Sequence, residues 1–566
     1  MTSLKTSIKT ITYLSDIGCL EIQGASLGIV NRVHNVLIYN TKSLIMLSHS
    51  DVHQTMITRE IMTPPTKIDT SSLLTILGVI AAVWALITPN ARLRLRFCLA
   101  WWDWAIVGFA FLLSNYLVFA PALKSLDLYF SFGPWKWGLD SSSAVYLISL
   151  AVAIYILFRL KKPKLSVGRT GIFLELVENL HLTKRYDDLA QLLAPQLEKL
   201  ISIIDSPVKN RLCDKIANNL RISNRETAAE YAHEALLNIV SSPELTNHFA
   251  LAHPSLCLEL IKIEPIVRSD FTSNFISALL DSPNSRLYVE LKNNLNVSRG
   301  HRLLIPKNNR ILHFFFSNAK FAADLAIYRD IGEYIYWRLD EDEKIIATLN
   351  KSLGSYSDVS KYKCPIYSGI TLFEIMVHEG IHQGLQDHLW LHYYTHFAKK
   401  IIKNMNRQSN EYSGEWETPF HFLLCHLFSI AINWAEQCEW IDERDILQEN
   451  KETENFDLHY ISKEATKLLG AMLELVLPNS KLTLKSRKDI LGIIVSCYIR
   501  LKRNKKLKDV ADSLLIFTTR GEGNLASPYY RKELLEIFNT LDDYRLRSDA
   551  PEFREAIESA IQARPN

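Results

Sequence analysis

Three long apolar segments stand near the start of the chain, and a longer region with a helical spacing of apolar positions follows them. The apolar segments cover residues 73–88, 98–120 and 144–160, and the middle one carries a carboxylate, Asp103. A bilayer core of about 30 Å is spanned by about 17–25 mostly apolar helical residues. Core helices of soluble proteins usually carry one apolar stripe rather than apolar residues all round. The pattern therefore predicts three transmembrane helices within residues 72–160.

Basic residues beside these segments predict how the chain crosses the membrane. The short loop expected between the first two spans contains Arg92, Arg94 and Arg96, and further basic residues from Arg159 to Lys164 follow the third. Short loops rich in Lys and Arg stay in the cytoplasm. With three spans, the N-terminus is expected outside and the C-terminal region in the cytosol. We therefore expect a multi-pass protein of a bacterial inner membrane.

The carboxylate of the middle segment stands among three tryptophans. Asp103 is flanked by Trp101, Trp102 and Trp104. Tryptophan is enriched where a membrane meets water. We therefore expect Asp103 near the lipid headgroups of the inner face, rather than deep in the bilayer, where an acid can mark an ion path.

Residues 1–61 have a different character. They show no helical periodicity and lack the order of basic, apolar and small residues that marks a signal peptide. If the N-terminus is outside, this whole extension would have to cross the membrane with its basic residues. A start at Met62 would leave only a short tail before the first span. We hypothesise that Met62 is the true start, so a peptide from residues 1–61 in the native protein would contradict this.

The region after the third span is predicted to be helical. Leu189, Leu192, Leu193, Leu197 and Leu200 recur at steps of three and four residues, the spacing of one buried helix face. Glycine is scarce, with 20 residues in 566 against an average near 7%. Scarce glycine favours helices over a turn-rich β architecture.

Helix start signals also recur along this region. Ser223 with Glu226 forms a capping box. Prolines that follow a plausible N-cap and open an apolar run are expected at the first position of a helix, and they are Pro243, Pro254, Pro419 and Pro551. The only strands we expect are short ones near residues 303–306 and 361–367.

The fold class is therefore mainly α, with three transmembrane helices followed by a large cytosolic helical array or solenoid. No fixed repeat period is present. Polar, turn-rich stretches divide the cytosolic part into three regions, which are residues 165–293, 310–447 and 458–566.

Charge and cysteine content exclude some functions. A net charge of +3 is too small to argue for a nucleic-acid partner. The eight cysteines form no CxxC pair, which fits reduced cytosolic thiols rather than a disulfide framework or a zinc knuckle. Phosphate-loop and dinucleotide-binding motifs are absent.

One stretch could carry chemistry. Residues 378–382 read His-Glu-Gly-Ile-His, an HExxH motif. Histidines four apart on a helix point the same way and can bind zinc together, while the glutamate polarises a metal-bound water. This short stretch resembles the core of the zincin metalloproteases. The resemblance implies that His378 and His382 are zinc ligands and that Glu379 is the general base.

A catalytic zinc site needs a third protein ligand. The metzincin pattern would place it at His388, and a histidine stands there. The glycine that turns the chain in that pattern would fall on Leu385, whereas this chain has Gly384, one place early. The gluzincin alternative takes a glutamate from a later helix, and the nearest candidates are Glu411, Glu415 and Glu417.

The motif could instead have a structural role. If residues 371–403 form one continuous helix, five histidines share a stripe about 27 Å long, which is too extended for one metal site. These histidines are His378, His382, His388, His392 and His396. Such a stripe would pack against acidic or aromatic partners.

The leading interpretation is a membrane-anchored protein whose cytosolic helical domain binds a protein partner or senses a condition. No resident cofactor is expected. A signal would pass through residues 161–169, where Pro163 interrupts helix continuity. The arrangement loosely resembles bacterial membrane effectors of stress or anti-phage systems, in which a cytosolic sensor drives a membrane part.

The alternative belongs to another class, a membrane-anchored zinc metallopeptidase that uses the HExxH helix and one zinc ion. For either function the lipid bilayer is a partner, and the transmembrane helices could associate into a homo-oligomer. Transport is disfavoured because the three spans contain almost no polar groups.

Overall fold

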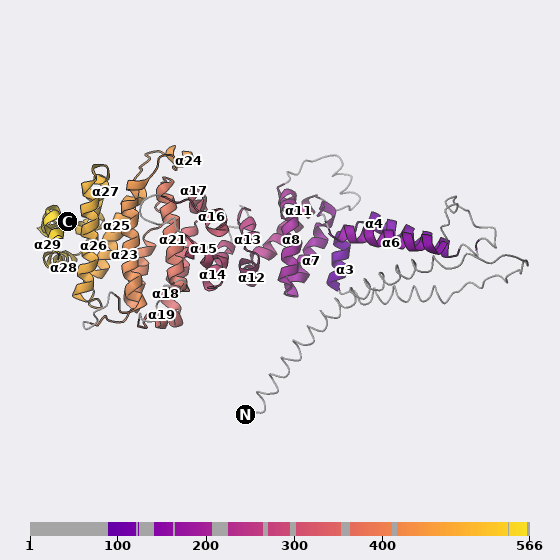
Figure 1. Cartoon of the computed structure of the whole chain (residues 1–566), viewed down its shortest axis with the longest axis horizontal. Helices are drawn as coiled ribbons and strands as arrows, with labels where there is room; N and C mark the ends of the chain where they lie inside the picture. Colours follow the sequence, from indigo (N-terminus) through magenta and orange to yellow (C-terminus); the bar gives the residue numbers. More distant parts are fainter. Residues whose placement is uncertain are drawn as a thin grey trace, which may run out of the picture. The chain divides into compact units, whose positions relative to one another are not determined.

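The structure, a computed structural model, describes residues 89–119, 141–161, 165–205, 225–263, 270–294, 302–352, 363–409, 416–541 and 543–562, together with 123, 163 and 361. Every regular element in these residues is a helix, and none of them lies in a strand. Two units can be distinguished by their contacts, and the second, residues 72–117 and 139–566, contains nearly all the described residues. The predicted mainly α fold class is confirmed (Figure 1).

Three helices belong to the predicted membrane region, namely α3 (Pro89–Cys98), α4 (Trp101–Val118) and α6 (Ser141–Lys161). The prediction that Arg92, Arg94 and Arg96 lie in a loop is wrong, because these residues are helical and belong to α3. The predicted middle span consequently begins at Trp101 rather than at residue 98.

Among the described residues, one helix alone is both long enough and apolar enough to span a membrane. The segment Ser143–Leu160 of α6 meets both conditions, and 0% of it is buried in the protein. The helical segments Arg92–Cys98 and Trp101–Val118 are long and apolar enough only when they are counted together, and the angle between them is 102°. The predicted span 73–88 lies outside the described residues, so three spans are not confirmed.

A helical body, defined here as residues 165–562, follows α6. Its first helices are α7 (Thr170–Leu182), α8 (Tyr186–Leu193), α9 (Leu197–Ile204), α11 (Arg225–Val240), α12 (Pro243–Ala252), α13 (Pro254–Ile261), α14 (Phe271–Asp281) and α15 (Arg286–Lys292). The next are α16 (Arg310–Phe316), α17 (Ala319–Asp324), α18 (Ile327–Glu341), α19 (Glu343–Leu349), α21 (Pro365–His382), α22 (Tyr393–Asn404), α23 (Pro419–Gln437) and α24 (Gln448–Lys451). The last are α25 (Tyr460–Val476), α26 (Leu484–Arg503), α27 (Lys508–Arg520), α28 (Pro528–Asn539), α29 (Tyr544–Asp549) and α30 (Pro551–Gln562).

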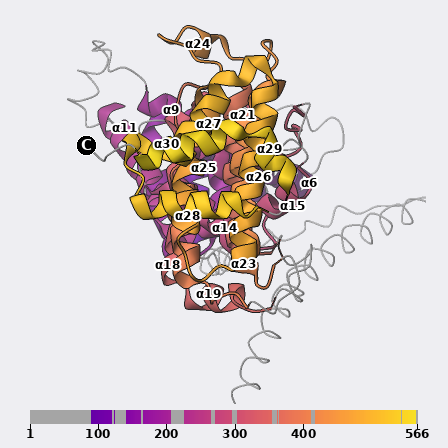
Figure 2. The same ribbon diagram turned by 90° about the vertical axis from the view of Figure 1, so that its left-hand side faces the viewer.

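Most packing in the helical body joins helices that are close in the chain. Helix α12 packs on α14, α14 on α18, α18 on α21, α23 on α25, and α25 on α27. At the C-terminal end α28 and α29 lie against α26, while α30 packs on α27 and α28 (Figure 2). Most of the buried apolar residues in the described part of the chain form one core cluster, which runs from Leu93 to Ile557. The predicted limits of the three cytosolic regions stay a prediction.

The helix start signals were read correctly where the structure describes them. Helices α12, α13, α23 and α30 begin at the predicted prolines, whose fixed φ suits the first helical position. The five leucines of the predicted stripe are all buried, but they lie on two helices, α8 and α9, separated by the 3-10 turn Ala194–Gln196. The capping residue Ser223 lies outside the described residues.

The two predicted strands are wrong. Residues 303–306 form an irregular segment, and α21 already begins at Pro365 within the second predicted strand. In the second segment, Ile366 and Tyr367 fill buried helix positions instead.

Candidate functional site

The HExxH motif occupies the last turn of α21, a helix surrounded by protein. Helix α21 packs against α18, α23 and α25, among others. Every residue from Ile366 to His382 is buried, so the helix is buried on all sides rather than along one stripe. The side chains of His378 and His382 are therefore shielded from solvent.

The two motif histidines lie together. Their ring centroids are 4.7 Å apart, as expected for residues four apart on one helix. Burial lowers the pKa of His378 to about 3, with smaller contributions from the charges of His382 and Arg302. Burial and then Arg302 lower the pKa of His382 to about 4. Both rings are neutral at physiological pH, the form in which imidazole binds a metal.

The hydrogen bonding of these rings is incomplete. Among the described residues, neither ring nitrogen of His378 has a hydrogen-bond partner, and Nδ1 of His382 has none. Nε2 of His382 lies 2.9 Å from Nε2 of Gln437. A buried polar atom without a partner costs about 1–3 kcal/mol, so the His378 ring carries such a cost at both of its nitrogens.

Glu379 is engaged in a buried charge network. Its Oε2 accepts a hydrogen bond from Nη2 of Arg302 and another, 3.1 Å long, from Nε2 of Gln383. Nη1 of Arg302 lies 3.1 Å from Oδ2 of Asp445, and the Arg302 side chain is only 8% exposed. The guanidinium places a positive charge beside the motif, which opposes the binding of a metal cation there.

Gly384 ends α21 directly after the motif. It adopts φ +67°, and two backbone hydrogen bonds close the turn, from Leu385 to Gly380 at 2.9 Å and from Gly384 to Ile381 at 3.2 Å. This pair of bonds is the Schellman motif, which favours glycine at the left-handed position. A Cβ atom on Gly384 would lie 2.6 Å from Cγ2 of Ile446, so a larger residue does not fit there.

His388 does not join the other two histidines. It follows α21 in the segment before α22, and its side chain is 51% exposed. Its Nδ1 accepts a 3.0 Å hydrogen bond from the backbone N–H of Trp390. Among the described residues, no group of three metal-ligating side chains includes His378 or His382. Of the glutamates considered as ligands, Glu411 and Glu415 lie outside the described residues, and Glu417 accepts a hydrogen bond from the Ser409 N–H.

The continuous helix over residues 371–403, on which the structural alternative depended, does not form, because α21 ends at His382 and α22 begins only at Tyr393. The five histidines therefore do not share one stripe. The segment between the two helices places Leu389 and Trp390 at φ +45° and +47°. Such angles cost about 1–3 kcal/mol per residue and gather at functional sites.

Trp390 is exposed at the centre of a small ring cluster. Its ring lies 5.5 Å from that of His388 and 4.9 Å from that of His392, and the ring of His396 lies 5.4 Å from His392. The side chain of Leu389 is fully buried and anchors the segment below it. We call this group, residues 388–396, the Trp390 surface.

A second acid–arginine pair joins the two apolar helices α4 and α6. Asp103 is buried, and Arg159 donates to it twice, through Nε at 3.0 Å and through Nη2 at 2.6 Å. Tyr155 and the backbone N–H of Ala100 also donate to Asp103, the latter at 2.6 Å. This two-point contact fixes α6 beside the start of α4 (Figure 1). The expected place of Asp103 near headgroups stays a prediction.

The base of these helices is tied to the helical body. Nη1 of Arg169 donates to the carbonyl of Phe97 at 2.9 Å. Gln196 accepts from the Leu165 N–H at 2.9 Å and donates to the Pro163 carbonyl at 2.7 Å. Within the junction predicted at residues 161–169, the described residues Pro163, Leu165 and Arg169 are therefore held by specific hydrogen bonds.

A pocket is lined by residues of α3, α4 and α7. Its volume is about 630 Å³, and it is lined by Arg92, Leu93, Leu95, Arg96, Trp104, Glu175 and Asn179. The lining combines two arginines with a tryptophan at the foot of α4.

Sequence reasoning missed two groups of potential metal ligands among the described residues. They are Asp187 with His248 and His253, and Asp457 with His459 and Asp509. In the first group the histidines lie 61 and 66 residues from the carboxylate. Only packing brings them together, so no local spacing could have revealed them.

No protein-family model matches the sequence, and no solved structure matches the fold.

Proposed function

We propose that this is a membrane-anchored protein in which α4 and α6 enter the bilayer and the helical body, a solenoid-like array, binds a protein partner or senses a condition in the cytosol. One observation carries the proposal, which is the exposure of apolar side chains on α4 and α6 while those of the helical body form its core. The large exposed residues of the two helices include Ile106, Phe109, Phe111, Leu112, Tyr146, Leu147, Leu150, Ile154, Leu157 and Phe158. Contiguous apolar surface on this scale marks a membrane or protein contact.

The polar groups at the base of the two helices support a membrane contact. Trp101 and Trp102 are exposed at the first turn of α4, where an interfacial aromatic belt would lie. The basic helix α3 turns away from α4 by 102°, as a helix lying on the membrane surface would. The charge of Asp103 is matched by Arg159, so neither group would enter the membrane boundary unpaired.

The Trp390 surface supports a protein partner for the helical body. An exposed tryptophan held by a strained backbone is typical of recognition sites, because aromatic anchors dominate binding energy. The further prediction that the protein is a bacterial stress or defence effector rests on architecture alone.

Membrane fractionation of the full chain tests the anchor. The unaltered protein is expected to stay in the pellet after an alkaline carbonate wash. Replacing both Leu150 and Ile154, which lie near the middle of the α6 segment, with Asp is expected to release it, because each central Asp costs about 2.5–3.5 kcal/mol on insertion scales. Leu525→Asp is the matched control, since Leu525 is 84% exposed on the helical body. Recovery of the unaltered chain in the soluble fraction would contradict the proposal.

A photo-crosslinking residue tests the partner surface. Placed at position 390, it is expected to give a discrete adduct in cells, whereas the same residue at the exposed Val289 gives none. Equal labelling at both positions would remove the Trp390 surface from the proposal.

The zinc metallopeptidase is the alternative function, and the geometry supports it less. The unpartnered nitrogens of His378 favour a metal. However, Glu379 is paired with Arg302, and His388 is 51% exposed and, among the described residues, forms no three-ligand group with His378 and His382. A peptidase would require zinc bound by His378 and His382, lost in His378→Gln, together with activity lost in Glu379→Gln.

A further inference from the structure

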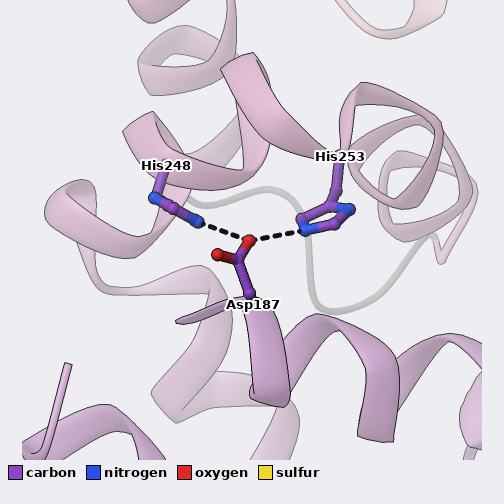
Figure 3. Close-up of side chains that lie close together, drawn as sticks. All are labelled: Asp187, His248 and His253. Carbon is purple, nitrogen blue, oxygen red and sulfur yellow. Dashed lines mark hydrogen bonds and ion pairs between the residues drawn. The ribbon is translucent and has the colours of Figure 1, made fainter. Parts of the chain in front are cut away.

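Three side chains from separate elements of the helical body converge at one point. Asp187 is the second residue of α8, His248 lies in α12, and His253 is the single residue between α12 and α13. Nε2 of His248 lies 3.0 Å from Oδ1 of Asp187, and Nε2 of His253 lies 2.9 Å from the same oxygen (Figure 3). All three potential ligand atoms lie within 4.8 Å of one another.

The local backbone fixes His253. This residue has φ −134° and ψ 52° and is followed by Pro254 at the first position of α13. A proline restricts the residue before it to conformations outside the helix, so the chain must turn at His253. Its N–H donates to the Phe249 carbonyl at 2.8 Å, and its carbonyl accepts from the Leu256 N–H at 2.9 Å.

Aromatic packing orients the two imidazoles. The ring of Phe249, which is fully buried, meets the ring of His253 edge to face at 6.3 Å. The ring of His248 lies 5.4 Å from that of Tyr186. Tyr186 is itself held by a 3.1 Å hydrogen bond to Glu244. The histidines are therefore directed toward Asp187 by their surroundings and not only by the hydrogen bonds that they make to it.

The donor set suits a transition metal. Two imidazole nitrogens and one carboxylate oxygen form a common three-ligand set for zinc and for related first-row divalent ions. The side chains of His248 and His253 are 36% and 34% exposed, so an ion can enter and keep water as a further ligand. In the described residues, neither lysine nor arginine forms an ion pair with Asp187.

The other histidine clusters lack one of these features. In the group of Asp457, His459 and Asp509, Nζ of Lys463 lies 2.8 Å from both carboxylates and already supplies the cation. At the HExxH motif, the described residues bring together only two potential ligands, His378 and His382, and Arg302 forms an ion pair with Glu379 between them in the sequence.

We propose that Asp187, His248 and His253 form a binding site for a divalent first-row transition metal such as Zn²⁺. Nε2 of each histidine and Oδ1 of Asp187 would be the protein ligands, and both rings would carry their proton on Nδ1. The bound ion would join α8 to α12 and α13. This site does not depend on the proposed membrane anchor or on the HExxH motif.

Zinc titration of the full chain tests the site. The protein is purified in detergent micelles, treated with a chelator, and titrated with Zn²⁺ by calorimetry. Binding of one ion per chain is expected, and the Kd should rise in His248→Gln and His253→Gln by more than the roughly 10–100-fold that loss of an outer-shell partner causes. His459→Gln and His378→Gln are the matched controls and should bind as the unaltered protein does.

Co²⁺ provides an independent readout. Its visible absorption bands are expected in the unaltered chain and absent in Asp187→Asn, a substitution that preserves side-chain shape if a histidine variant fails to fold. Zinc should also raise the thermal unfolding midpoint of the unaltered protein but not of Asp187→Asn.

Three results would overturn the proposal. They are the absence of zinc binding in the unaltered chain, equal binding in a correctly folded His248→Gln variant, and loss of binding in His378→Gln instead. The last result would favour the metallopeptidase alternative, whereas none of the three would affect the membrane anchor.

Discussion

The pair α4 and α6 and the helix α21 are both strongly apolar, yet they occupy opposite environments. None of the apolar segment of α6 is buried in the protein, whereas α21 is buried from Ile366 to His382. Each region also contains an acid–arginine pair, Asp103 with Arg159 and Glu379 with Arg302. The arginine is 40% exposed in the first pair and 8% exposed in the second. The apolar composition of a helix therefore does not determine whether other parts of the protein cover it. The helices packed around it determine that.

The difference in arginine exposure gives the largest predicted effect. Arg302→Ala leaves the buried Glu379 carboxylate without its main cation, and breaking such a pair costs about 3–5 kcal/mol. Unfolding of the full chain by urea in micelles, followed by circular dichroism, measures the change. Arg444→Ala is the control, because Arg444 is 88% exposed in its pair with Asp442 and should change stability by less than about 0.5 kcal/mol.

The double variant with Arg302→Met and Glu379→Gln sharpens this test. Removing both charges should recover most of the lost stability, because the cost comes from the unpaired charge rather than from the missing contact. A double variant as unstable as Arg302→Ala would show that packing of the arginine, and not charge, holds α21 at this end.

The end of α21 gives the next effect. Gly384→Ala should destabilise the protein by about 1–2 kcal/mol through the left-handed backbone and by about 1–3 kcal/mol more through overpacking against Ile446. Gly523→Ala isolates the first contribution. Gly523 has φ +60°, but a Cβ atom added there would lie 3.7 Å from its nearest neighbour, Cδ1 of Leu525, which is an ordinary contact. Equal urea midpoints for the two variants would contradict the close approach at Ile446.

The apolar helix pair should respond less than α21. Asp103→Asn removes the charge from a two-point contact, and hydrogen bonds to charged groups contribute about 1.5–3 kcal/mol. Arg159 is 40% exposed and can be solvated after the change, which limits the loss. Limited proteolysis in micelles should show faster cleavage near α4 and α6 and unchanged cleavage in the helical body. If the free energy of unfolding measured in urea fell as much in Asp103→Asn as in Arg302→Ala, the two acid–arginine pairs would be equivalent.

The sequence reveals much of the helical body because its start signals are local. Proline at a first helical turn and leucines at steps of three and four depend only on nearby residues, so they placed the starts of α12 and α13 and identified the buried leucines of α8 and α9, although not the turn between those two helices. The break after His382 was also signalled locally, by Gly384. It was interpreted as a displaced metzincin glycine, whereas its function is to end α21.

The contacts around the candidate site could not be predicted in this way. Arg302 and Glu379 are 77 residues apart, and His253 and Asp187 are 66 residues apart. Nothing in either local sequence specifies the other partner, since these contacts follow from how the helices pack. The spacing of HExxH correctly predicts that His378 and His382 share a face, but not that Arg302 lies beside them.

Acid and base should both destabilise the protein through α21, because three of its buried groups have shifted pKa values. Burial lowers the pKa of His378 to about 3 and that of His382 to about 4, from 6.5. Burial raises the pKa of Glu374 from 4.5 to about 8. Between pH 6.5 and 4.5 the unfolded chain holds two protons on these histidines, and the folded chain holds one, on Glu374. Folding therefore releases a net proton there, and stability falls as pH falls.

Above pH 6.5 the sign reverses, because only the folded chain keeps the proton on Glu374 until pH 8. These three groups should thus give a stability maximum near pH 6.5, with a slope of about 1.4 kcal/mol per pH unit on each side. Glu374→Gln should abolish the alkaline slope and roughly double the acid slope, whereas His378→Gln should flatten the acid side alone. Urea midpoints measured from pH 4.5 to 8 test this. If neither substitution changed how the urea midpoint depends on pH, water would reach the buried groups of α21. The burial of α21 and the exposure of α6 would then differ less than the structure indicates.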